Sequence, residues 1–131
     1  MSGTYLLDAN AVIALVIAEH EHHRRVALWA AGVDGVALCP VTEGAMVRYL
    51  LRVGETPATA LELLAALHQS TKSHFWPDSI SYADTALTHV TGHRQVTDAY
   101  LASLAASHGT RLATFDEALA TTLPQHVELI P

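Results

Sequence analysis

The chain of 131 residues contains little cysteine and no long apolar run. Cys39 is its only cysteine, so an internal disulfide bond is excluded and a reducing cytosol suits the chain. No apolar run approaches the roughly 20 residues that a membrane-spanning helix needs. The amino terminus also lacks the charged start and the cleavage pattern of a signal peptide. We therefore expect a cytoplasmic protein without a membrane partner.

Positive charge is scarce as well. The chain has 7 lysine and arginine residues against 13 aspartate and glutamate residues, and its formal net charge is −6. Proteins that bind nucleic acid through its phosphates usually carry an excess of basic side chains. Net charge by itself therefore argues against a nucleic-acid partner, and only a separate role for the acidic residues removes this objection.

Several catalytic signatures are absent. The 7 glycines are dispersed, and neither the dinucleotide-binding fingerprint nor the P-loop pattern occurs. No Gly-x-Ser-x-Gly nucleophile elbow is present. A phosphoaspartate enzyme with Asp8 as nucleophile stays open in principle. However, haloacid dehalogenase-like phosphatases carry a second aspartate where this chain has Asn10, and response-regulator receivers need a late lysine, whereas the only lysine here is Lys72.

Short strand-like runs alternate with helical patterns along the chain. Strands are predicted at 4–8, 36–39, 111–116 and 127–130, and 74–78 is either a short edge strand or a loop because Pro77 cannot donate to a ladder. Helices are predicted at 10–20, 21–32, 42–54, 56–70, 81–90 and 97–109. This alternation, in a chain of which 50% is hydrophobic, predicts a single domain over 1–131 with a mainly parallel sheet between two helical layers.

Four acidic residues follow the predicted strands or begin the predicted helices, namely Asp8, Glu43, Asp98 and Asp116. Each has a purely structural explanation, because a carboxylate in the first helical turn gains about 0.3 to 1 kcal/mol from the helix dipole. At Asp8 capping and chemistry are equally good explanations, since Asn10 could cap the helix alone. Parallel strands present their carboxyl ends at one edge, so we expect the four acids to converge there.

Four converging carboxylates repel one another by roughly 4 kcal/mol per close pair at an effective dielectric constant of about 20. That repulsion exceeds what the helix dipole returns, so a positive charge should lie between them. Carboxylate oxygens suit a hard cation such as Mg²⁺ or Mn²⁺, whereas zinc prefers histidine and cysteine. The sequence therefore predicts a magnesium or manganese site.

The histidine-rich segment 19–25 is a rival metal signal. Only His20 and His23 would share a helical face there, and two ligands do not make a zinc site. We interpret the segment as the solvated face of a helix whose apolar side contains Val26 and Trp29. A role for 20–23 does not follow from the sequence.

The runs "LLDAN", "VTEGAMVRYLL", "VTDAYLASLA" and "LATFD" resemble PIN-domain ribonucleases, specifically the VapC toxins of bacterial toxin–antitoxin pairs. The resemblance covers nearly the whole chain and implies a PIN-like α/β/α sandwich that cleaves single-stranded or loop RNA, such as tRNA or rRNA, with Mg²⁺ or Mn²⁺. It also implies that Asp8, Glu43, Asp98 and Asp116 are the acidic site residues and that Thr97 lies close to their pocket. Asn10 then helps the turn after Asp8.

The resemblance changes the meaning of the net charge, because four acids belong to a pocket that divalent cations neutralise. Phosphate contacts could come from Arg48, Arg52 and Arg94, although a solvated helix face explains these arginines equally well. The family further implies a VapB-like antitoxin and a homodimer, for which the apolar helices 11–18 and 60–68 offer surplus hydrophobic surface. An inactive PIN-type binding module and a metal-dependent DNA nuclease remain alternatives.

Overall fold

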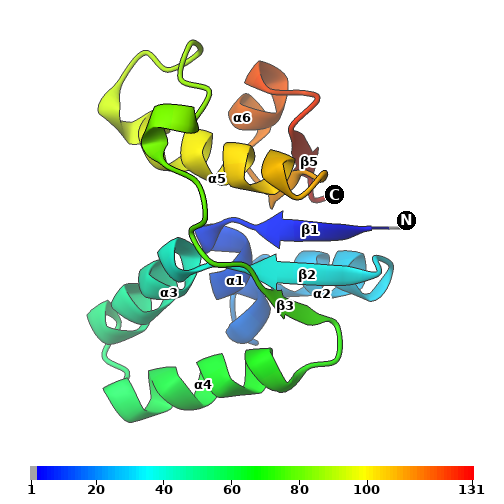
Figure 1. Cartoon of the computed structure of the whole chain (residues 1–131). Helices are drawn as coiled ribbons and strands as arrows, with labels where there is room; N and C mark the ends of the chain where they lie inside the picture. Colours follow the sequence, from blue (N-terminus) through cyan, green and yellow to red (C-terminus); the bar gives the residue numbers. More distant parts are fainter. Residues whose placement is uncertain (1–2) are drawn as a thin grey trace.

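The computed structural model describes residues 3–131 and has a parallel sheet at its centre (Figure 1). Within these residues the five strands are β1 (Thr4–Leu7), β2 (Gly35–Leu38), β3 (Ser73–Phe75), β4 (Leu112–Thr114) and β5 (Val127–Leu129). Their order is β3-β2-β1-β4-β5, and every neighbouring pair is parallel. Because β1 is central, the residue that follows it lies between the ends of β2 and β4.

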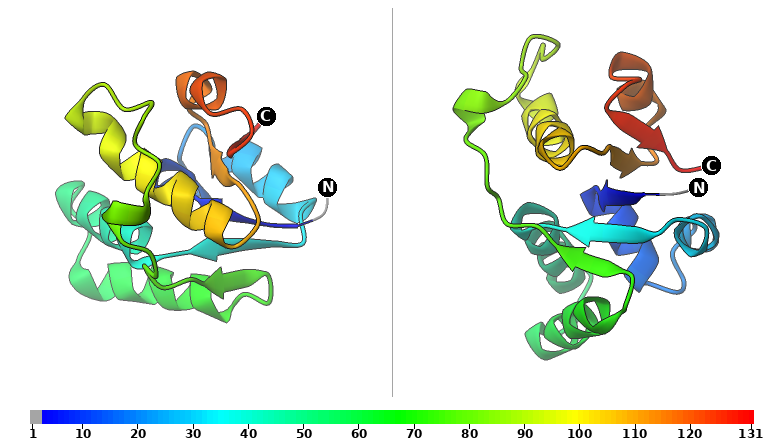
Figure 2. Two further views of the ribbon diagram at one scale, coloured as in Figure 1. Left: turned by 45° about the horizontal axis from the view of Figure 1, so that its top comes forward. Right: turned by 45° about the vertical axis from the view of Figure 1, so that its right-hand side comes forward.

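Helices cover both faces of the sheet. They are α1 (Ala9–Val16), α2 (His23–Ala31), α3 (Pro40–Arg52), α4 (Pro57–Gln69), α5 (Val96–Ser107) and α6 (Glu117–Thr122), with the 3₁₀ turns η1 (Tyr82–Asp84) and η2 (His93–Gln95). In the left view of Figure 2, α5 crosses in front of the strands and α2 lies behind them. The predicted α/β/α sandwich with a parallel sheet is therefore confirmed.

Alternation along the strands divides the core into two layers. Leu7 of β1 packs with buried residues of α1, α2 and α3, whereas Leu6 packs with α5 on the opposite face. Both leucines are fully buried, as expected for a central strand that is covered on both sides. Helix α1 takes part in this core through Ala11 to Ala14, so the prediction that segment 11–18 offers surplus apolar surface is wrong for these four residues.

The segment 81–90 does not form the predicted helix. Only η1 is helical there, and Ser81 accepts a hydrogen bond from the amide of Ala83 while Thr85 donates to the Ser81 carbonyl. Such bonds from short polar side chains compete with helical hydrogen bonding. A tertiary bond from the Ala86 amide to Ser103 Oγ then ties the segment to α5.

The histidine-rich segment also differs from its prediction. Helix α1 ends at Val16 and α2 begins at His23, so 17–22 is a connecting loop and not a helical face. The loop turns because the His22 amide donates to His20 Nδ1 and the His23 amide donates to the His20 carbonyl, each over 3.0 Å. Val26 and Trp29 are buried, as predicted.

Two further predictions concern the sheet edge and the membrane. Segment 74–78 contributes to β3, which pairs with β2 and ends before Pro77. Every helix among residues 3–131 is too short or too polar to span a bilayer.

Candidate active site at the carboxyl edge of the sheet

Asp8 lies directly after β1 and is the best-anchored acid of this edge. Its Oδ1 caps α1 by accepting a hydrogen bond from the Ala11 amide over 2.8 Å, and its Oδ2 accepts a hydrogen bond from the Thr114 hydroxyl. The residue is only 7% exposed. The pKa of the Asp8 carboxyl is raised to about 6, chiefly because the group is buried; its two hydrogen bonds lower the pKa, and the nearby charges of Asp98 and Asp116 raise it.

Asp98 and Asp116 approach Asp8 from two other elements. Asp98 lies in the first turn of α5, where burial first and the charge of Asp116 second raise the pKa of its carboxyl. Asp116 caps α6 by accepting a hydrogen bond from the Leu119 amide over 3.0 Å, and it is exposed. These three carboxylates therefore act on one another electrostatically, as the sequence predicted.

Thr114, at the end of β4, connects two of these acids and was missed in the sequence. It is fully buried, its hydroxyl donates to Asp8, and its oxygen accepts a hydrogen bond from the Asp116 amide over 3.1 Å. The only signal was its position, two residues before Asp116 and at the end of an apolar strand. A strand threonine is usually a packing residue, so that signal does not point to a role by itself.

Glu43 lies in the first turn of α3, but a partner from another helix holds its carboxylate. Glu43 Oε2 is 2.5 Å from His68 Nε2 of α4, and the two side chains are 14% and 41% exposed. The charges that raise the pKa of Asp8 come from Asp98 and Asp116. The structure therefore brings three of the four acids together and directs the fourth toward α4.

Two shallow cavities meet at Asp116. The smaller, of about 100 Å³, is lined by His89, Gln95, Asp98, Asp116, Ala118, Leu119 and Thr122. The larger, of about 370 Å³, is lined by Asn10, His20, Glu21, His22, Thr114, Phe115 and Asp116. Asp116 thus lines both cavities.

The remaining predicted site residues are exposed. Thr97 directly precedes Asp98, and Asn10 is in the first turn of α1. Arg94 belongs to η2, while Arg48 and Arg52 lie on α3, where the guanidinium of Arg52 is 5.4 Å from the Tyr49 ring centre.

The donor chemistry of the three acids is compatible with a hard divalent cation. Within residues 3–131, no ion pair joins Asp8, Asp98 or Asp116 to a basic side chain. In the same part of the chain, no group of three or more histidine, cysteine or acidic side chains is arranged closely enough to hold a metal ion. The carboxylates thus present uncompensated oxygen donors, which Mg²⁺ and Mn²⁺ prefer, without a finished coordination shell.

Comparison with known proteins agrees with this geometry. The PIN domain family model matches residues 5–122. The chain is 49% identical over 129 residues to ribonuclease VapC29 of Mycobacterium tuberculosis, across 98% of this chain and 97% of that protein.

Solved structures share the fold. VapC20 of M. tuberculosis, a sarcin–ricin-loop-cleaving toxin, has a TM-score of 0.72 at 20% identity, across 98% of this chain and 100% of that chain. VapBC2 of Rickettsia felis, solved with a DNA fragment from its promoter, has a TM-score of 0.66 at 14% identity, across 98% and 100% of the two chains. The chain therefore belongs to the PIN-domain family and is a ribonuclease toxin of the VapC type.

Proposed function

We propose that this protein is a Mg²⁺- or Mn²⁺-dependent endoribonuclease, formed by residues 1–131 as one PIN domain, that hydrolyses phosphodiester bonds in single-stranded or loop RNA. The observation that carries the proposal is the uncompensated cluster of Asp8, Asp98 and Asp116. Burial, and then mutual repulsion, raise the pKa of Asp8 and of Asp98, and such an arrangement costs stability unless a cation or a substrate uses it.

Each acid has a distinct part in this proposal. Asp8 is held rigidly by Thr114 and by the amide of Ala11, so it offers a preorganised carboxylate. Asp98 and Asp116 would hold the cation together with Asp8, directly or through water. A divalent cation bound there would activate water for in-line attack on phosphorus and stabilise charge on the scissile phosphate. This hydrolysis leaves a 5′-phosphate and a 3′-hydroxyl.

Glu43 and the exposed polar residues complete the site. Glu43 orients the attacking water or joins the metal ligands once its carboxylate leaves His68. Arg48, Arg52 and Arg94 contact phosphates on either side of the cut, which needs exposed guanidinium groups. Thr97 and Asn10 are close enough in sequence to Asp98 and Asp8 to contact the substrate beside them.

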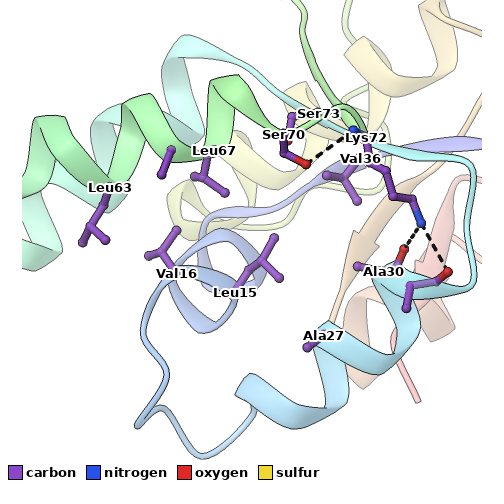
Figure 3. Close-up of a pocket in the computed structure, with 12 residues that line it drawn as sticks. Leu15, Val16, Ala27, Ala30, Val36, Leu63, Leu67, Ser70, Lys72 and Ser73 are labelled. Atoms are coloured by element: carbon purple, nitrogen blue, oxygen red, sulfur yellow. Dashed lines mark hydrogen bonds between the residues drawn. The ribbon is translucent and has the colours of Figure 1, made fainter.

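A VapB-like antitoxin is the proposed partner, and an apolar groove supports this. The groove, of about 400 Å³, lies between α1, α2 and α4, with Leu15, Leu63 and Leu67 among its walls (Figure 3). An amphipathic antitoxin segment would cover it and bring a basic side chain to the acids. Leu63→Asp should prevent co-purification with co-expressed antitoxin while RNA cleavage persists, and a variant that is still neutralised would exclude this groove.

We further propose a homodimer. Leu61 of α4 is 64% exposed and Leu28 of α2 is 67% exposed, so apolar side chains remain at the surface. Light scattering at micromolar concentration should give twice the mass of the chain, and a strict monomer would contradict this proposal.

The central test uses matched RNA and DNA oligonucleotides with and without divalent cation. We expect Mg²⁺ or Mn²⁺ to support cleavage of RNA and excess EDTA to stop it. Cleavage that persists in excess chelator would remove the metal mechanism, cleavage of DNA alone would indicate a DNA nuclease, and RNA binding without cleavage would indicate an inactive binding module. Sequencing of the RNA ends after brief expression identifies the substrate.

A further inference from the structure

The loop 17–22 places two histidine rings beside the candidate active site. The ring centres of His20 and His22 are 5.7 Å apart, and those of His22 and Phe115 are 4.9 Å apart. The three rings therefore form a row. All three line the cavity of about 370 Å³ whose other walls include Asn10 and Asp116. His20 and His22 belong to the histidine-rich segment 19–25, which has no role in the proposed hydrolysis.

Arg25 contacts two members of the row, His22 and Phe115. Its guanidinium donates to the carbonyls of Ile130 and Pro131 over 3.0 and 2.9 Å, and its carbon lies 4.8 Å from the Phe115 ring centre. The same group lies 3.0 Å from His22 Nδ1. Because a guanidinium can only donate, His22 Nδ1 is the acceptor of this bond. The row is thus a built and anchored surface.

All three residues of the row are partly exposed, including His22. Its side chain is 33% exposed, so part of the ring stays accessible from the cavity. His20 Nδ1 is engaged by the His22 amide, which orients the second ring. The Nε2 edges of both rings are therefore the edges left for a ligand, although His22 Nε2 also lies 3.4 Å from the carboxylate of the exposed Glu21.

A metal does not explain this arrangement. Within residues 3–131 no group of three potential nitrogen, sulfur or carboxylate ligands is close enough to bind one, and His20, Glu21, His22 and Asp116 are not such a group. Partly exposed rings that line a cavity, with polar edges beside them, instead match the way proteins bind unpaired bases. Single-stranded RNA is recognised by stacking on aromatic or guanidinium planes together with hydrogen bonds to base edges.

We propose that His20, His22 and Phe115 form a subsite that stacks one base of the RNA substrate next to the scissile phosphate. The proposal rests on the proposed ribonuclease function, because Asp116 is shared between the acid cluster and this cavity. The exposed amide of Asn10 faces the same space and can donate to or accept from a base edge.

The first test measures binding without cleavage. Nucleoside 5′-monophosphates are titrated into the metal-free protein while the ring resonances of His20, His22 and Phe115 are followed by NMR. We expect these resonances to shift with a nucleotide and to stay in place with ribose 5-phosphate, which has the phosphate and the sugar but no base. Equal shifts with both compounds, or no shift with either, would overturn the subsite.

The second test measures cleavage by His22→Ala, with His126→Ala as a control at an exposed histidine outside this cavity. Loss of one stacking contact should lower kcat/KM about tenfold in His22→Ala, since base stacking carries effects of this size. The control should match wild type. A set of RNA substrates is then made, each lacking the base at one position beside the cut. On one of these substrates His22→Ala and wild type should have the same kcat/KM, because the base that stacks on the row is missing.

The outcomes separate the two proposals. A wild-type protein that fails to cut RNA but shows the base-dependent shifts refutes the ribonuclease proposal and retains a nucleotide-binding subsite. Active wild type with a folded, fully active His22→Ala refutes the subsite and retains the ribonuclease. A tenfold loss that is the same on every abasic substrate also refutes the subsite, because it would show a structural role for His22.

Discussion

Two groups of carboxylates at one sheet edge have different surroundings. Asp8, Asp98 and Asp116 face one another without a basic partner among residues 3–131, and burial raises the pKa of Asp8 and Asp98. Glu43 follows β2 at the same edge, yet its carboxylate contacts His68 over 2.5 Å. The three acids therefore lack a basic partner in the described part of the chain, whereas the fourth already has a partner within the protein.

The difference teaches that position in the sheet does not by itself decide what an acid does. Glu43 and Asp98 both occupy a first helical turn, where the dipole favours a negative charge. Glu43 contacts the imidazole of a neighbouring helix, because α4 packs against α3. Removing the charge of Asp98 and freeing Glu43 from His68 should therefore have different consequences for cleavage.

The largest effect is expected for Asp98→Asn. Asparagine keeps the shape of the side chain but removes one charge from the cluster, so cleavage should fall about a thousandfold, which is several kcal/mol of barrier. Without metal, the variant should melt at the wild-type temperature or slightly above it, because repulsion with Asp116 is relieved. Paired measurements of cleavage rate with Mg²⁺ and of melting temperature in EDTA check both parts.

A merely structural Asp98 would give the reverse pattern. Its loss would cost at most about 1 kcal/mol of dipole energy and leave cleavage intact. Asp98→Asn that cuts RNA at nearly the wild-type rate would therefore end the assignment of Asp98 and weaken the whole acid cluster.

The sequence predicted the sheet and the two helical layers, which follow from local periodicity and from parallel topology. It also predicted that four acids converge, and three of them act on one another. It did not predict the partner of Glu43, because His68 lies 25 residues away and the contact depends on how α3 and α4 pack. Thr114 was missed for a similar reason, since a strand threonine gives no sign that its hydroxyl will reach Asp8. The helix predicted for 81–90 does not form, because hydrogen bonds from the side chains of this segment compete with helical hydrogen bonds.

An effect of intermediate size is expected when the stability of Asp8→Asn is compared with that of wild type at different pH values, without metal. Folding raises the pKa of Asp8 from 3.8 to about 6, so this residue favours the folded state fully below pH 3.8 and loses that contribution as the pH rises through about 6. A rise of this size in the pKa corresponds to roughly 3 kcal/mol. Asp8→Asn, which carries no charge at any pH, should gain stability over wild type as the pH rises from 4 to 7.

Urea unfolding in EDTA across this range measures the difference between the two proteins. A difference that stays constant from pH 4 to pH 7 would show that Asp8 is not strained by its burial and its neighbours. Thr114→Val provides a second check, because it removes the hydrogen bond that favours the Asp8 carboxylate and should enlarge the loss of stability toward neutral pH.

The smallest effect is expected for His68→Ala, which frees Glu43. An ion pair whose histidine is 41% exposed contributes only about 0 to 1 kcal/mol, so the free energy of unfolding should change little. If Glu43 serves the acid cluster, its release should increase the apparent affinity for Mg²⁺ by a few fold, because the cation no longer competes with His68. His68→Gln keeps a hydrogen-bond donor, so its apparent affinity for Mg²⁺ should lie between those of wild type and His68→Ala.

The dependence of the cleavage rate on Mg²⁺ concentration measures this affinity. In a Glu43→Gln background, His68→Ala should have no further effect. Identical curves for wild type and His68→Ala would show that the Glu43–His68 contact only joins α3 to α4 and that the active site needs three acids, not four.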